Sequence, residues 1–157
     1  MNKFKIKPSQ MILDFIKSFE ELRLEAYICP AGKLTIGYGH TSGVKSGMKI
    51  TREEAEDLLK RDVSFAEKAV DDIQQYFSYQ CFTQNEYDAL LSLVFNIGNE
   101  KFRNSTIRRM IIAGMPKEQI AEQFLKWTYI KGKYSNGLQR RRQQEKRIFL
   151  GGSYKNV

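Results

Sequence analysis

Residues 20–40 of this chain read EELRLEAYICPAGKLTIGYGH. On both sides of CPAG, apolar residues alternate with polar ones, which is the pattern of two antiparallel strands. The Pro and Gly of CPAG occupy the second and fourth places of a type I turn. The stretch therefore predicts a hairpin that follows a helix ending at Glu20, carries Cys29 at its turn and Thr35 on its second strand, and closes in a Gly-Tyr-Gly-His corner.

Capping signals predict helices on both sides of this hairpin. Ser9 can cap a helix with one apolar face that ends at Glu20. Thr51 and Thr83, each followed three residues later by glutamate, match the capping box. The first capping box opens a long charged helix, and the second opens an apolar helix that we expect to be buried. Further helices are predicted over 105–114, from 116 onward and over 138–150.

These elements indicate an α+β arrangement in one domain covering 1–157. A lobe with the hairpin takes up about 8–50, a connecting helix about 51–71, and a helical lobe about 72–157. A chain of 157 residues is long enough to bury a core of its own.

Composition is typical of a globular protein, at 41% hydrophobic and 28% charged residues. The formal charge of +8 favours polyanionic partners: nucleic acid, anionic membranes or the acidic polymers of a bacterial envelope. Two cysteines without a CxxC pair and a single histidine give no metal-ligand spacing, so we expect no metal and no cofactor. Charged residues interrupt the first apolar segment, MILDFIKSFE, so neither a secretory signal nor a membrane span is expected, and the chain should accumulate in the cytoplasm.

The glutamate at the helix end suggests glycoside hydrolysis. That reaction needs an acid to protonate the leaving oxygen and usually a second carboxylate to direct water or attack the sugar. A single glutamate among 18 acidic residues is weak evidence by itself, because most such residues lie on the surface.

The hairpin stretch resembles the active-site signature of the phage lysozymes, the endolysin muramidases. That signature is a Glu, eight residues, an Asp, five residues, a Thr and then Ile-Gly-x-Gly-His. Four later stretches resemble the family in the same order: QNEYDALLSLVFNIG, FRNSTIRRMI, WTYIKGKYSNGLQRRR and EKRIFLGG. The resemblance implies a lysozyme-like fold and a monomeric muramidase that cleaves the β-1,4 bond between N-acetylmuramic acid and N-acetylglucosamine with inversion. It also implies a role in host cell lysis and phage release, with passage from the host cytoplasm through a holin.

The chain departs from this signature at two positions. Glu21 stands where the family often has glycine, but the spacing to Thr35 selects Glu20 as the acid. Cys29 stands where the family has aspartate. A thiol can accept a hydrogen bond and can become a thiolate, so we interpret Cys29 as a substitute for the carboxylate that manages water. The alternatives are a structural cysteine or a nucleophile paired with His40.

The resemblance implies roles for three further residues of this region. The Thr35 hydroxyl is expected to hold the attacking water. His40 is expected to pair with Asp62 on the long helix, as a structural contact between hairpin and helix rather than as a catalytic group.

In the helical lobe the resemblance assigns substrate binding to Asn96 and Arg140. Asn96 lies at the end of the apolar helix, where capping next to Gly98 is the structural alternative. Arg140 is expected to point into the cleft and pair with Glu20. Arg141 and Arg142 are expected to be surface charge that helps the protein sit on an anionic wall.

Two other functions are compatible with single features of the sequence. Cys29 and His40 suggest a cysteine-dependent peptidase or amidase acting on peptidoglycan. The charge, the arginine run and 12% aromatic residues suggest a nucleic-acid-binding module, although no nucleic-acid motif is present and none is expected as a partner. Oxidation of Cys29, or a disulfide with Cys81, is a possible redox control.

Overall fold

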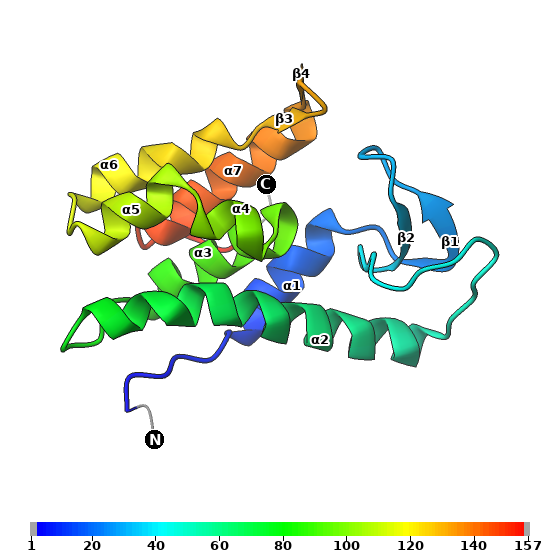
Figure 1. Ribbon diagram of the computed structural model, residues 1–157, viewed down its shortest axis with the longest axis horizontal. Coiled ribbons are helices and arrows are strands. Elements are labelled where there is room, and N and C mark those ends of the chain that lie inside the picture. The colour runs from blue at the N-terminus through cyan, green and yellow to red at the C-terminus, as the bar shows by residue number, and fades with distance from the viewer. Residues whose placement is uncertain (1–2, 156–157) are drawn as a thin grey trace.

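The structure is a computed structural model that describes residues 3–155. A hairpin of β1 (Arg23–Ile28) and β2 (Leu34–Gly37) lies at one end, and most of the helices gather at the other (Figure 1). The long helix α2 (Arg52–Asp71) runs from the hairpin end along the helical part. This arrangement confirms the α+β prediction.

Helix α1 (Gln10–Phe19) delivers Glu20 as predicted. The Ser9 hydroxyl accepts a hydrogen bond from the Ile12 amide and so caps the first turn. Glu20 is the C-cap residue, and its N–H donates to the Lys17 carbonyl at 3.2 Å. The helix buries its apolar face through Ile12, Phe15 and Ile16.

The hairpin turn also forms as predicted. The Gly32 amide donates to the Cys29 carbonyl at 2.8 Å, which closes the CPAG turn. Gly32 has φ +83°, a left-handed conformation that glycine adopts without a steric penalty. Beyond the turn, Tyr27 pairs with Thr35 in the antiparallel register.

The apolar alternation of β1 does not face a core. Leu24 is 41% exposed and Ile28 is 65% exposed. The lobe contains two strands and the segment 48–50, which hydrogen-bonds to β1 through Met48 and Ile50. So small a sheet is packed against too few other residues to bury the apolar side chains of β1.

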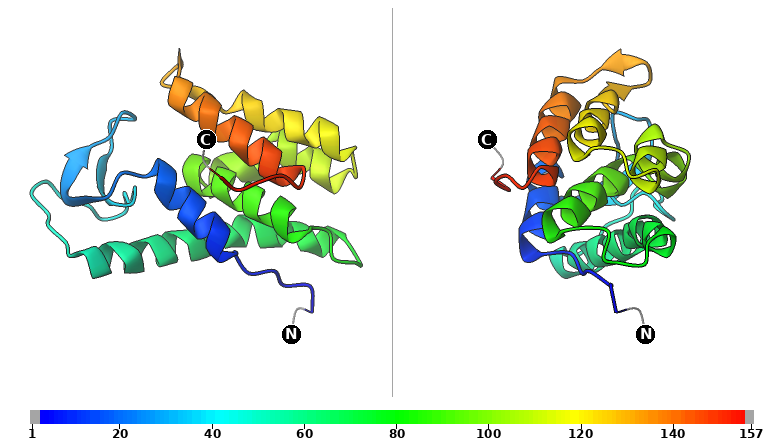
Figure 2. Two further views of the ribbon diagram at one scale, coloured as in Figure 1. Left: turned by 180° about the vertical axis from the view of Figure 1, so that it is seen from behind. Right: turned by 90° about the vertical axis from the view of Figure 1, so that its left-hand side faces the viewer.

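The two capping boxes are present, at Thr51 with Glu54 and at Thr83 with Glu86. Helix α3 (Gln84–Ile97) is the buried central helix that the apolar pattern predicts, and it packs against α2 and α7 (Asn136–Phe149), as the right-hand view of Figure 2 shows. The remaining elements are η1 (Asp72–Tyr76), α4 (Asn99–Arg103), α5 (Thr106–Ile112), α6 (Lys117–Glu122), η2 (Gln123–Lys126), β3 (Tyr129–Ile130) and β4 (Lys133–Tyr134).

Sequence reasoning missed the β3–β4 hairpin and α4. The strands β3 and β4 have two residues each, too few for a period-2 pattern to be visible. Helix α4 has five residues and follows Gly98, which reads as the end of α3.

Cys29 and Cys81 are both free, and the segments that carry them lie toward opposite ends of α2. The hairpin bearing Cys29 is tied to the N-terminal end of α2, whereas Cys81 follows η1 beyond its C-terminal end. A helix of 20 residues is about 30 Å long. A disulfide between them does not fit this fold, because it needs Cα atoms within about 7 Å.

Candidate active site

The Glu20 carboxylate is held by an arginine from the opposite end of the chain. Its Oε1 lies 2.9 Å from a terminal guanidinium nitrogen of Arg141, which α7 brings to the end of α1. The side chain of Glu20 is 20% exposed and that of Arg141 only 4% exposed. The Arg141 guanidinium also lies over the Phe19 ring, 5.3 Å from its centroid. Glu20 is thus a half-buried carboxylate with one oxygen fixed.

The prediction that Arg140 pairs with Glu20 is wrong, because the pairing residue is Arg141. Arg140 is exposed, and Arg141 and Arg142 are buried rather than surface charges. Successive residues of a helix point about 100° apart, so a shift of one position changes the face on which a side chain lies. The run of three arginines gave no sign of which one faces inward.

Behind Arg141 lies a buried carboxylate that sequence reasoning missed. Glu145 has no exposed surface and accepts hydrogen bonds from Arg141 Nε at 3.1 Å and from an Arg142 terminal nitrogen at 2.5 and 2.7 Å. The Ser92 hydroxyl donates to it at 3.1 Å. Two guanidinium groups therefore balance the carboxylates of Glu145 and Glu20. The spacing of Arg141 and Arg142, four and three residues before Glu145, was the available signal.

Gly39 lets the corner of the hairpin approach the second oxygen of Glu20. A Cβ atom on Gly39 would lie 2.9 Å from Glu20 Oε2. Gly39 has φ +85°, and the corner closes through two 2.9 Å backbone hydrogen bonds between Ile36 and His40. Glycine therefore suits this position for two reasons. It adopts the left-handed backbone conformation without a steric penalty, and its missing side chain leaves room for the Glu20 carboxylate.

Cys29 and Thr35 form the hairpin side of the site. Cys29 is half-buried, and Thr35 is 2% exposed with its hydroxyl donating to the Lys33 carbonyl at 2.9 Å. Burial raises the pKa of the Cys29 thiol, but hydrogen bonds from the Thr35 hydroxyl and the backbone amides of residues 31–33 outweigh burial and lower it below the ordinary thiol value. The single Thr35 proton can serve either acceptor, so its hydroxyl can turn from the carbonyl to the sulfur.

Tyr27 is a further site residue that sequence reasoning missed. Burial and the nearby charges of Glu20 and Cys29 raise the pKa of its phenol. The Arg23 guanidinium covers its ring at 4.4 Å from the centroid. The charges of Glu20 and Cys29 therefore act on the Tyr27 phenol. Tyr27 also pairs with Thr35 across the hairpin.

The structure brings His40 and Asp62 together. His40 Nδ1 lies 2.9 Å from Asp62 Oδ2, and Nε2 lies 2.8 Å from the Ser42 carbonyl oxygen. Both ring nitrogens are occupied, so neither is placed to act as a base for Cys29. This geometry does not support the peptidase or amidase alternative.

Asn96 is exposed in the last turn of α3, and Gly98, with φ +93°, is the C-cap residue. Its Oδ1 accepts a hydrogen bond from Arg142, whose Nε also donates to the Trp127 carbonyl at 2.9 Å. Asn96 is thus anchored to the same buried cluster that supports Arg141.

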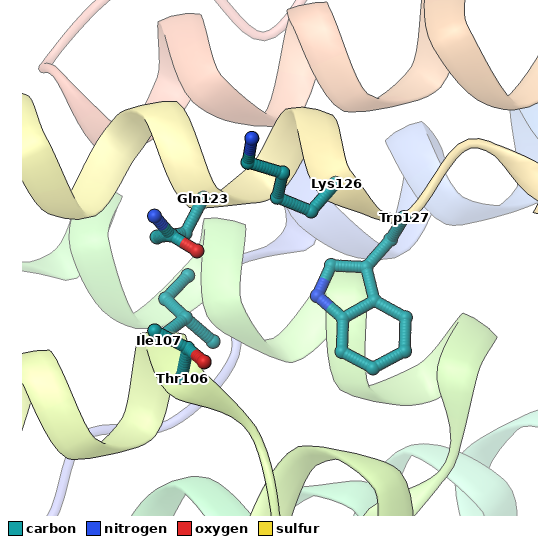
Figure 3. A pocket seen from close by; sticks show the side chains of 5 residues that line it. All are labelled: Thr106, Ile107, Gln123, Lys126 and Trp127. Carbon is teal, nitrogen blue, oxygen red and sulfur yellow. The ribbon is translucent and has the colours of Figure 1, made fainter.

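A separate pocket of about 410 Å³ lies between α5 and η2 (Figure 3). Its walls are Thr106, Ile107, Gln123, Lys126 and Trp127. It contains none of the residues that the sequence assigns to the site. In residues 3–155, no group of three metal-ligating side chains is present, and no helix has the length and apolar character needed to cross a membrane.

Comparison with known proteins assigns the chain to a family. The chain matches the family described as Phage lysozyme over residues 17–145. It is 41% identical to an endolysin of Acyrthosiphon pisum secondary endosymbiont phage 1, over 90% of this chain and 96% of that protein. It is also 41% identical to an endolysin of Bacillus phage B103, over 95% of this chain but only 56% of that protein, so it spans little more than half of that relative.

Among solved structures, the muramidase domain of SpmX from Asticaccaulis excentricus superimposes with a TM-score of 0.79 at 37% identity. The match covers 93% of this chain and 99% of that domain. The family match, the relatives and the fold agree, and the chain belongs to the phage lysozyme family.

Proposed function

We propose that this protein is a muramidase that hydrolyses the β-1,4 bond between N-acetylmuramic acid and N-acetylglucosamine in peptidoglycan. The observation that carries the proposal is the fixed orientation of Glu20. Arg141 holds Oε1 at 2.9 Å, while Oε2 faces the Gly39 corner. The family membership and the neighbour described as a muramidase domain support the same reaction.

In this proposal Glu20 is the general acid. Because Oε1 is engaged by Arg141, Oε2 is the oxygen that carries the proton and gives it to the glycosidic oxygen as the bond to C1 breaks. The buried partners of Arg141 keep that orientation without using the substrate.

Cys29 and Thr35 manage the water. The Thr35 hydroxyl orients a water molecule on the far face of the sugar, and the water oxygen forms a bond to C1 with inversion. The proton that this water loses passes to the Cys29 thiolate, whose formation the lowered pKa favours. Exchange with solvent then returns the proton to Glu20 and removes it from Cys29.

Asn96 and Arg140 are proposed to bind the sugar chain, and the protein is proposed to act as a monomer on the cell wall during host lysis. It would accumulate in the host cytoplasm and reach the wall with the help of a holin. Nucleic acid is not a proposed partner.

The test is incubation of purified peptidoglycan with the wild type, Glu20→Gln and Cys29→Asp, followed by counting new reducing ends. The wild type should release them, Glu20→Gln should lose at least about 10²-fold in rate, and Cys29→Asp should retain substantial activity. Release of free amines instead, abolished by Cys29→Ala, would show a thiol peptidase or amidase.

Anomeric NMR of a soluble oligosaccharide substrate separates the two stereochemical courses. The α anomer should appear first. A β product formed first contradicts the inverting step while leaving the muramidase assignment intact.

A further inference from the structure

The turn between β3 and β4 holds a lysine in an unfavourable conformation. Ile130 pairs with Lys133, which leaves Lys131 and Gly132 as a two-residue loop with φ values of +49° and +77°. Two positive φ angles match a type I′ turn, whose first position favours Asn, Asp or Gly. Among residues 3–155, Lys131 is the only non-glycine residue with positive φ. Non-glycine residues held in this backbone conformation cluster at active sites and ligand-binding sites.

This hairpin is braced so that the turn stays in place. Tyr129 pairs with Tyr134 in the register, and their rings meet edge to face at 5.9 Å between centroids. The Ser135 amide closes the base of the hairpin by donating to the Thr128 carbonyl at 2.8 Å.

Lys131 reaches across to the catalytic hairpin. A Cβ atom built on Gly32 would lie 2.7 Å from Lys131 Nζ, although the two residues come from opposite lobes. Figure 1 and the left-hand view of Figure 2 show the β3–β4 turn and the β1–β2 turn on the same side of the molecule. Gly32 belongs to the turn that Cys29 opens, so the ammonium lies at the edge of the proposed site.

The ammonium group of Lys131 has no carboxylate partner among residues 3–155. In this range Lys17, Lys117 and Lys146 pair with glutamates, and most other lysines, like Lys131, form no ion pair, so what distinguishes Lys131 is its position. Lys131 instead faces a turn in which a glycine leaves room for its side chain. An unpaired cation beside a substrate cleft favours a carboxylate on the substrate.

We propose that Lys131 is a specificity-determining residue that binds a free carboxylate of the peptidoglycan stem peptide. This inference rests on the proposed muramidase function. A glycan strand in the site would extend its muramyl peptides outward, toward the edge where Lys131 lies. Neutral glycans of the same linkage lack that carboxylate and do not gain the contact.

The test compares two variants on two forms of one substrate. Lys131→Asn removes the charge but suits the type I′ turn, and Lys133→Gln removes the same charge two residues away on β4. The substrates are purified peptidoglycan and the same material with its carboxylates converted to methylamides. The apparent KM for reducing-end release is measured for the wild type and for each variant on each of the two substrates.

Lys131→Asn should raise the apparent KM on untreated peptidoglycan about two- to fivefold, as expected for an exposed ion pair. It should leave the KM on the amidated substrate unchanged, keep kcat, and melt at the same or a higher temperature. Lys133→Gln should change neither KM.

Four results would overturn the inference. The KM of Lys131→Asn could rise equally on both substrates, or the KM of Lys133→Gln could rise as much as that of Lys131→Asn. The KM of Lys131→Asn could also stay unchanged while the wild type is active, or it could fall, which would make Lys131 a closing contact that substrate must displace. A wild type that releases no reducing ends instead overturns the proposed function.

Discussion

Arg141 and Glu20 lie 121 residues apart in the chain, and their side chains meet at 2.9 Å. The same guanidinium donates from Nε to Glu145, which has no exposed surface. A line of three charged groups thus runs from the buried interior of the helical lobe to the half-buried Glu20 carboxylate. The orientation of the proposed acid depends on the packing of α7 against α3.

Arg141→Lys is expected to lower kcat for reducing-end release by about 10- to 100-fold. Lysine keeps the charge but cannot bond Glu20, Glu145 and Ser92 together as the planar guanidinium does. Steady-state kinetics on solubilised peptidoglycan measures the loss. Arg147→Lys on the same helix is the matched control and should keep kcat, because Arg147 Nε donates to the Ser153 carbonyl rather than to Glu20. An equal loss of kcat in Arg147→Lys would show that the effect is not specific to Arg141.

Glu145→Gln is expected to destabilise the fold by about 3–5 kcal/mol, because it leaves the buried guanidinium of Arg142 without a carboxylate and that of Arg141 with Glu20 alone. Urea unfolding followed by circular dichroism measures the change. The control is Glu122→Gln, which breaks the pair with Lys146 at a glutamate that is 59% exposed and should cost less than about 1 kcal/mol. An equal loss in the free energy of unfolding for the two variants would show that the buried cluster stabilises the fold no more than an exposed ion pair does.

Gly39→Ala is expected to reduce activity about 10²-fold, because its Cβ would meet Glu20 Oε2 at 2.9 Å and displace it. Gly43→Ala is the control, since Gly43 also has positive φ but a Cβ there meets nothing within 4 Å. Both variants should lose about 1–2 kcal/mol of stability from the left-handed backbone. Only Gly39→Ala should lose activity, and a similar loss in Gly43→Ala would assign the effect to backbone strain.

The two cysteines should react at different pH values. Hydrogen bonding lowers the pKa of Cys29, whereas burial raises the pKa of Cys81 to about 11. Since the thiolate is the reactive form, alkylation of Cys29 should accelerate as pH rises toward its lowered pKa, while Cys81 stays slow until more alkaline pH. Iodoacetamide labelling with peptide mass spectrometry reads both sites in one sample. Faster labelling of Cys81 at pH 8 would contradict the environment described for Cys29.

The lowered pKa also sets the sign of the pH dependence of activity. If the Cys29 thiolate accepts the proton from water, the rate should rise with pH up to the pKa of Cys29. Cys29→Asp should move that rising limb to acidic pH, because a carboxylate ionises near pH 4. A rising limb that stays in place in Cys29→Asp would show that another group titrates.

Local chemistry fixed what the sequence could predict. The caps at Ser9, Thr51 and Thr83 and the turn after Cys29 depend on residues within a few positions of each other, and the structure has all four. The spacing from Glu20 to Thr35 was likewise visible, because the two strands that carry it are adjacent in the chain. The central helix was visible because its second half, through Leu90, Leu91, Leu93, Val94 and Phe95, is apolar nearly all round.

Tertiary packing decided the rest of the site. Which of three consecutive arginines reaches Glu20 depends on the rotation of α7 against α3, and a shift of one residue turns a side chain by about 100°. The contacts around Arg141 and Glu20 form only when α3, α7 and the hairpin corner come together. These contacts involve Glu145, Ser92 and Gly39. The sequence by itself determined most of the elements and the order of the proposed catalytic groups. Only the folded chain determined which charges are buried together, because that depends on contacts between segments far apart in sequence.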